Sequence, residues 1–369
     1  MAATRRDLLV GGAAAVAAIP AFARSRSAGV ANAGLWPDDR GVHVNAHGGG
    51  LLRHGDRWYW FGEHKTVGEG GNTALVGVHA YSSADLIAWR DEGIALAVSD
   101  DPASDITRGC VLERPKVLRD PVTGKFVMWF HLELKGQGYA AARAGVAVAD
   151  RITGPYRFLR SGRVNPGLWP ANVTPADKAD PRQPLVRDFA GGQMARDMTL
   201  FVDAENTAWH VYSSEENQTL QAARLRPDLT AHDGHYTRIL PGGGNEAPAI
   251  FRARGRYYMI TSGLTGWAPN PARSFVADRI DGPWTPLGNP VRGTPTQVAT
   301  TFGGQSTFVL PLPTRGGAER FVFMADIWRP KNAIDGRYVW LPIEWEGDRP
   351  ILHWRDRWSP DTIEQGNHA

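Results

Sequence analysis

The feature that most constrains the fold is a short unit that recurs along the chain. Each unit is a polar or glycine-containing turn followed by a strand rich in aromatic and β-branched residues, which is typical of a β-hairpin. Convincing helical periodicity is scarce after residue 24. Five copies of the unit occur, at 55–61, 124–130, 205–212, 255–260 and 318–324.

A second signature follows several of these units and predicts a tight turn before an outer strand. Residues 149–156 and 277–284 share the pattern Ala-Asp-Arg-Ile-x-Gly-Pro-aromatic, residues 83–89 are a variant of it, and residues 225–229 are a degenerate fourth copy. Repeats of roughly 50–80 residues that each supply a few antiparallel strands favour a β-propeller. We therefore predict an all-β, five-bladed β-propeller as a single domain over residues 24–369. The runs at 338–343 and 351–354 should complete the ring, and a β-sandwich with coincidental hairpins is the alternative.

Composition excludes several classes of protein. The single cysteine, Cys110, rules out an intramolecular disulfide framework and a cysteine-based metal site. A formal net charge of +3 gives no support to a nucleic-acid partner, and we expect a monomer. Fourteen tryptophans are unusual, and we interpret some of them as surfaces on which a ligand stacks.

The first residues are typical of an export signal. Arg5-Arg6 precedes an uncharged run from Leu8 to Ala23, which ends in the small-residue cleavage pattern Ala21-Phe22-Ala23. The run is too short to cross a membrane comfortably as a helix, and the arginine pair matches a twin-arginine signal. We expect residues 1–23 to be removed and the mature protein to be periplasmic or secreted, with no membrane association. A frayed N-terminal helix is the alternative.

Carboxylates stand at the start of three short apolar strands, where the innermost strand of a propeller blade would reach the mouth of the central channel. These residues are Glu113, Asp197 and Glu246. Like charges that converge on one axis raise the pKa of at least one carboxyl group, which is what a general acid needs near neutral pH. The trio therefore predicts an acid–base site, although each residue alone would suit a solvated turn.

At these strand starts the chain resembles the propellers of glycoside hydrolase family 43, and the similarity covers residues 35–358. Within that family it is most similar to the exo-β-1,3-galactanase group. The motifs that carry the resemblance are Val44-Asn45-Ala46-His47-Gly48-Gly49-Gly50, Tyr59-Trp60-Phe61-Gly62-Glu63-His64-Lys65, Glu113-Arg114-Pro115-Lys116-Val117, Arg196-Asp197-Met198-Thr199-Leu200-Phe201, Glu246-Ala247-Pro248, Thr265-Gly266-Trp267 and Gly304-Gln305-Ser306-Thr307-Phe308-Val309.

The resemblance implies an inverting hydrolysis of β-1,3-linked galactan, with action at chain ends. Glu246 matches the family's general acid, and Asp197 matches the carboxylate that orients this acid and tunes its pKa. Most of the family has an aspartate base in the first blade, but here that stretch reads Asn45-Ala46-His47. The galactanase group instead offers a glutamine, matched by Gln305, to position the water. A neutral amide is a poor base, so it needs an unusual tautomer or help from a carboxylate such as Glu113.

Further matched positions surround the group's sugar-binding subsite. Carboxylates suit such a subsite because they accept hydrogen bonds from vicinal hydroxyls, and an indole face stacks on sugar C–H groups. For the tryptophan among them, core packing is the alternative. The matched residues are His47, Glu63, Asn217, Thr265 and Trp267.

Several other functions stay open. The same fold could act on xylosides or arabinofuranosides, could bind carbohydrate without hydrolysis because the usual base is missing, or could serve as an interaction scaffold. An esterase is disfavoured because the loop at 47–50 has no G-x-S-x-G partner, and His43 and His47 do not form an H-E-x-x-H zinc motif. No cofactor is required, and nothing in the sequence establishes the calcium or sodium ion that this family can hold near its axis.

Overall fold

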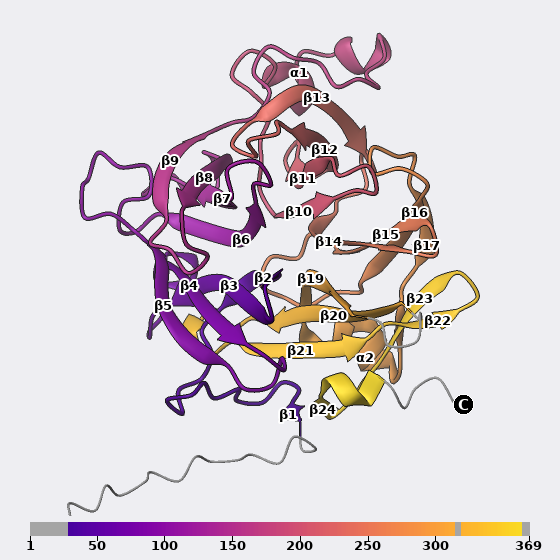
Figure 1. The fold of residues 1–369 in the computed structure, drawn as a ribbon. Helices are drawn as coiled ribbons and strands as arrows, with labels where there is room; N and C mark the ends of the chain where they lie inside the picture. The colour runs from indigo at the N-terminus through magenta and orange to yellow at the C-terminus, as the bar shows by residue number, and fades with distance from the viewer. Residues whose placement is uncertain (1–28, 314–318, 364–369) are drawn as a thin grey trace, which may run out of the picture.

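The computed structural model describes residues 29–313 and 319–363, whose strands are arranged in sheets around one axis (Figure 1). The predicted export signal, residues 1–23, lies outside the described residues.

Four antiparallel sheets of four strands follow one another along the chain. The first has β2 (His47–His54), β3 (Arg57–Lys65), β4 (Leu75–Ser83) and β5 (Arg90–Ala97). The second has β6 (Val111–Arg119), β7 (Phe126–Glu133), β8 (Arg143–Ala149) and β9 (Arg157–Gly162). The third has β10 (Met198–Val202), β11 (Ala208–Ser214), β12 (Thr219–Leu225) and β13 (His232–Ile239), and the fourth has β14 (Glu246–Ala253), β15 (Arg256–Ser262), β16 (Arg273–Ala277) and β17 (Thr285–Gly288).

The remaining strands form smaller sheets, and helices are short. The fifth sheet has β19 (Gln305–Leu312), β20 (Arg320–Ile327) and β21 (Arg337–Pro342). A sixth has β18 (Val291–Arg292), β23 (Arg349–His353) and β22 (Glu344–Glu346), and β1 (Val30–Ala31) pairs with β24 (Arg357–Trp358). The α-helices are α1 (Pro184–Arg187) and α2 (Pro295–Thr300), and the 3₁₀ turns are η1 (Gly71–Thr73), η2 (Ala176–Lys178), η3 (Thr301–Gly303), η4 (Ala333–Asp335) and η5 (Pro360–Ile363).

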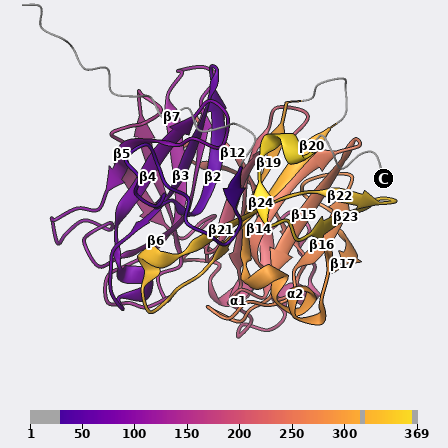
Figure 2. The same cartoon turned by 90° about the horizontal axis from the view of Figure 1, so that it is seen from below.

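The predicted all-β propeller is confirmed, but the predicted number of blades is wrong. Counted as sheets of three or more strands, the described residues form six blades, not five. The sequence does not reveal the sixth sheet because its strands are only two, three and five residues long and because β18 pairs in parallel with β23, Val291 opposite Leu352. The run at 351–354, expected to complete the ring, lies in this sheet, beside β15–β17 in both views (Figures 1 and 2).

The first strands of five sheets surround the axis (Figure 1). Strands β2, β6, β10, β14 and β19 contact one another in that cyclic order, and β19 contacts β2 again. The repeated hairpin units form the second strand of each of these sheets, and all four copies of the second signature precede an outermost strand, namely β5, β9, β13 or β17. The sixth sheet contacts the fifth through β23 and β21, outside this ring.

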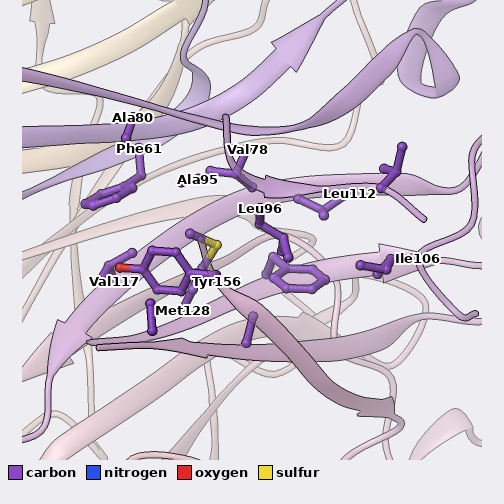
Figure 3. Packing of buried hydrophobic residues seen from close by; sticks show 14 of the residues in the cluster. Phe61, Val78, Ala80, Ala95, Leu96, Ile106, Leu112, Val117, Met128 and Tyr156 are labelled. Carbon is purple, nitrogen blue, oxygen red and sulfur yellow. The ribbon is translucent and has the colours of Figure 1, made fainter. Parts of the chain in front are cut away.

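The hydrophobic core lies between neighbouring sheets. Between the first and second sheets, Phe61 and Val78 pack with Met128 and Tyr156 (Figure 3). The seam between the fifth and first sheets contains many of the tryptophans, each at most 1% exposed, so these pack in the core and are not ligand platforms. They are Trp36, Trp60, Trp89, Trp340 and Trp358.

The two ends of the described chain close the ring beside that seam. Strand β1 pairs with β24, and the Asn32 side chain donates to the carbonyls of Trp340 at 3.0 Å and Arg355 at 2.8 Å. Within residues 29–313 and 319–363, no helix has the length and apolar character needed to cross a bilayer.

Candidate active site

The starts of the inner strands are irregular, and this irregularity shapes one end of the axis. Pairing with the second strand shifts register just after His47, Glu113 and Glu246. Such β-bulges re-aim side chains out of the normal alternation, and positive φ is unfavourable for residues other than glycine. The residue after each of the three has positive φ: Gly48 at 61°, Arg114 at 56° and Ala247 at 53°.

A cavity of about 330 Å³ opens at this end of the axis, and we refer to it as the pit. Seven of the sequence-predicted site residues line it: Glu63, Glu113, Asp197, Asn217, Glu246, Trp267 and Gln305. The pit brings them together from all five sheets of the ring. The other lining residues, which have no role predicted from the sequence, are Asn72, Arg114, His131, Tyr139, Arg196, Gly266 and Trp328.

Two predicted sugar-binding residues lie outside the lining of the pit. His47 is fully buried, with its ring stacked on Tyr338 at 5.4 Å between centroids. The Thr265 hydroxyl donates to the Ala268 carbonyl at 2.5 Å and accepts from Asn270 Nδ2 at 2.7 Å, within its own loop. Thr265 lines a neighbouring open pocket of about 410 Å³. Neither residue lines the pit, and their role in sugar binding stays a prediction.

Arg114 lies at the centre of the polar network. Its Nε and Nη2 donate to the two carboxylate oxygens of Asp197 at 3.1 and 2.9 Å, and Nη2 also donates to Gln305 Oε1 at 2.6 Å. Its backbone N–H donates to Glu63 Oε1 at 3.0 Å. Burial alone would lower the pKa of Arg114, but the charges of Asp197 and the other carboxylates raise it. The guanidinium is a permanent cation that links residues of the third and fifth sheets, and the backbone N–H of Arg114 adds Glu63 of the first sheet.

Glu246 has the properties of a general acid. It begins β14, and its Oε1 accepts a hydrogen bond from Asn217 Nδ2 at 2.7 Å. Burial and the negative charge of Asp197 raise the pKa of Glu246 to about 7, against the opposing effects of Arg114 and of the Asn217 hydrogen bond. A carboxylic acid with this pKa is still substantially protonated near neutral pH and can donate its proton there.

Glu113, in contrast to Glu246, is held in its ionised form. Its Oε2 lies 3.0 Å from His131 Nδ1, and the other ring nitrogen of His131 lies 2.9 Å from Glu133 Oε1. Burial opposes the charge on each partner, but the hydrogen bonds and charges of this group lower the pKa of Glu113 to about 2 and raise that of His131 to about 9. Tyr139 Oη donates to the remaining oxygen of Glu113 at 2.9 Å. Glu113 is therefore an ionised acceptor.

The side-chain amide of Gln305 is held on both sides. Its Oε1 accepts hydrogen bonds from Arg114 and, at 2.8 Å, from Trp328 Nε1, while its Nε2 donates to Ser262 Oγ at 2.9 Å. An amide oxygen has two lone pairs, and both are used by N–H donors here. This arrangement stabilises the ordinary amide form and leaves one Nε2 hydrogen for a water molecule.

One group of the described residues brings three potential metal-ligand atoms within 4.8 Å of one another: Glu113, His131 and Asp197. Metal binding requires a neutral imidazole, whereas the raised pKa of His131 keeps it protonated at neutral pH. These residues are better described as an ion-paired cluster, and we assign them no metal.

Comparisons with known proteins agree on one family. No protein-family model and no curated protein matches the chain. Among solved structures, a family-43 β-1,3-galactosidase with galactodeoxynojirimycin is 50% identical, covers 89% of this chain and 100% of its own, and has a TM-score of 0.83. An exo-β-1,3-galactanase from Clostridium thermocellum is 30% identical over 89% of this chain and 66% of its own, with a TM-score of 0.76. A variant of the Phanerochaete chrysosporium exo-β-1,3-galactanase with β-1,3-galactotriose is 30% identical over 89% and 68%, with a TM-score of 0.73.

Proposed function

The chain belongs to glycoside hydrolase family 43, and we propose that it hydrolyses β-1,3-linked galactan from chain ends with inversion at the anomeric carbon. The match to a β-1,3-galactosidase at 50% identity over the whole of that chain supports the substrate. The observation that carries the chemistry is the half-buried Glu246, whose pKa of about 7 contrasts with the ionised groups facing it.

In this proposal Glu246 gives its proton to the glycosidic oxygen as the bond from that oxygen to the anomeric carbon breaks. Asn217 occupies Oε1 of Glu246, which leaves Oε2 to carry the proton. The Asn217 N–H then stabilises the carboxylate that forms. Asp197 keeps Glu246 protonated before the step because its negative charge raises the pKa of the acid.

A water molecule attacks the anomeric carbon from the opposite face. Both lone pairs of the Gln305 amide oxygen already accept hydrogen bonds, so the side chain has only one Nε2 hydrogen to offer a water molecule. This favours a role in holding the water over a role as base. Once the water oxygen has bonded to the electron-deficient carbon, its proton is acidic enough to pass to a weakly basic carboxylate, and Glu113 is the ionised carboxylate we assign. The products are galactose and a chain one residue shorter.

Glu63 and Trp267 are the residues we assign to sugar binding. Both line the pit. Trp267 is 37% exposed and meets Trp328 edge-on at 5.7 Å, which favours a surface for sugar C–H groups over the alternative of core packing. Glu63 is held in place by the Arg114 backbone and by Lys65 Nζ at 2.7 Å.

The decisive experiment compares β-1,3-galactan with aryl xyloside and aryl arabinofuranoside, for the wild type and Glu246→Gln. We expect galactose to be released from galactan alone, first as the α-anomer in NMR spectra because inversion of a β-linkage gives α. Release of xylose or arabinose would favour the related activities. Binding of galactan that leads to no turnover would favour a non-hydrolytic carbohydrate-binding propeller.

We also propose export through the twin-arginine signal, which rests on Arg5-Arg6 and the uncharged run that follows. A change of this pair to Lys-Lys should leave the precursor in the cytoplasm. Fractionation of cells with an antibody against the mature domain would test this, and normal export of the changed protein would contradict it.

A further inference from the structure

The order of the inner strands indicates how a bound sugar lies in the pit. The ring runs β2, β6, β10, β14, β19, so the sheet that begins with Glu246 lies opposite the seam between the first and second sheets. The general acid protonates the oxygen of the leaving chain, which must therefore lie on the β14 side. The far end of the bound sugar points towards the seam between β2 and β6.

Two loops meet across that seam. Asn72 lies in η1, between β3 and β4, and Tyr139 lies in the connection between β7 and β8. Asn72 Nδ2 donates to Tyr139 Oη, and both residues line the pit. We refer to this pair as the wall.

The wall is tied to its surroundings on both sides. The Tyr139 hydroxyl donates to Glu113 Oε1 at 2.9 Å, and its carbonyl accepts from Arg196 Nη2 at 2.6 Å. In the other loop, the Gly68 N–H donates to Asn332 Oδ1 at 3.0 Å, which joins the first sheet to the fifth. These bonds hold the wall between the second, third and fifth sheets.

The side of the pit next to Glu246 is different. The open pocket of about 410 Å³ begins there, lined by Gly242–Gly244 just before the acid and by Leu264, which is 37% exposed. We expect the leaving chain to run over these residues. The wall therefore stands on the side of the pit opposite the acid, with Tyr139 41% exposed, and the second pocket lies on the side of the acid.

We propose that the Asn72–Tyr139 wall is the specificity determinant that restricts hydrolysis to the terminal galactosyl residue. This inference rests on the proposed function. In a β-1,3-linked chain, every internal residue carries its next neighbour on O3, and the wall occupies the space that this neighbour needs. A terminal residue carries only a hydroxyl there and fits.

The test uses two β-1,3-galactotetraoses labelled at the reducing end, one of them capped with a methyl group on O3 of the non-reducing residue. The wild type should hydrolyse the uncapped substrate and discriminate strongly against the capped one. In Asn72→Gly and Tyr139→Ala, the ratio of kcat/KM for capped to uncapped substrate should rise by about tenfold or more, the usual range for exclusion of a small apolar group. Thr73→Ala is the matched control, because this exposed neighbour bonds only the Gly70 carbonyl at 2.9 Å, and its ratio should stay at the wild-type value.

The ratio is the readout because Tyr139→Ala also removes a donor to Glu113 and so lowers both rates. A wild-type ratio in both Asn72→Gly and Tyr139→Ala, with the uncapped substrate still hydrolysed, would overturn the role of the wall. Failure of the wild type to hydrolyse the uncapped substrate would instead overturn the proposed function.

Discussion

The same inner strands form two ends of the axis with opposite chemistry. At the strand starts lies the charged pit, whereas further along the same strands Leu52, Leu118 and Phe251 line an apolar cavity of about 350 Å³. The backbone explains the difference: bulges interrupt the pairing at the starts, and regular antiparallel register follows, with Val117 opposite Met128. Regular alternation builds the structure, and the functional groups lie where alternation breaks.

Lys116 marks the boundary between the two ends. It lines the apolar cavity and is 3% exposed, and its Nζ donates to the Gly48 carbonyl at 2.9 Å. Burial and the charge of Arg114 lower the pKa of Lys116 to about 7. The change from charged to apolar surroundings therefore takes place within one strand.

The largest expected effect is a loss of activity on substitution at the charged end of the axis. Glu246→Ala should lower kcat on galactan by about two to four orders of magnitude, because it removes the proton donor. The melting temperature should stay close to that of the wild type, since this side chain lies in the pit and not in the core. Steady-state kinetics with unactivated galactan measures the effect, and a loss below about tenfold would contradict the assignment.

The matching change at the apolar end should act on stability. Phe251 is 2% exposed and packs against Phe321 at 5.0 Å between ring centroids. Phe251→Ala should lower the free energy of unfolding by about 3–5 kcal/mol, as loss of a buried phenylalanine does. Denaturant titration measures this loss, and a shifted pH–rate profile in the variant would show that the two ends are not separate.

A pair of substitutions in the pit should move the pH profile in opposite directions. Activity needs protonated Glu246, so kcat/KM should fall as pH rises through about 7. Asp197→Asn removes the charge that raises the pKa of the acid and leaves Arg114 uncompensated, so the basic limb should move to lower pH. Asn217→Ala removes a donor that lowers this pKa, so the limb should move to higher pH. Shifts of the same sign would refute this account of the acid.

The smallest effect concerns the pH dependence of folding. The pKa of His131 is raised from 6.5 to about 9, so its stabilising contribution is fully present below pH 6.5 and is lost as pH rises through about 9. His131→Gln should remove this loss between pH 6.5 and 9, measured as the unfolding midpoint in urea at each pH. His353→Gln, at a side chain that is 43% exposed, is the control. An unchanged pH slope in His131→Gln would exclude the ion-paired arrangement.

Arg114 shows which part of the site sequence patterns cannot reveal. In a regular strand, neighbours point to opposite faces, so a strand that sends Glu113 into the pit should send Arg114 away. Both reach the pit because Arg114 adopts a φ of 56°, a conformation that an arginine gives no reason to expect. The carboxylates at strand starts were predictable because they stand at the same place in successive repeats.

The fold follows the same rule. A hairpin joins strands that are neighbours in the chain, so its turn and strand residues are enough to predict it from the sequence. The sixth sheet and the tryptophan seam depend on partners far apart in the chain, such as Trp36 and Trp340, whose rings lie 5.1 Å apart. No local pattern contains that pairing, so the sequence does not show which of the fourteen tryptophans pack in the core.

The pairing of β1 with β24 joins the two ends of the described chain without a covalent bond. Only Val30 opposite Trp358 and Ala31 opposite Arg357 pair at this joint, with the Asn32 side chain donating to the carbonyls of Trp340 and Arg355. A circularly permuted version, with the two ends fused and the chain cut at an outer hairpin, would replace this joint with a covalent link and keep every sheet intact. Any module tethered to one end of the domain would emerge next to a module tethered to the other.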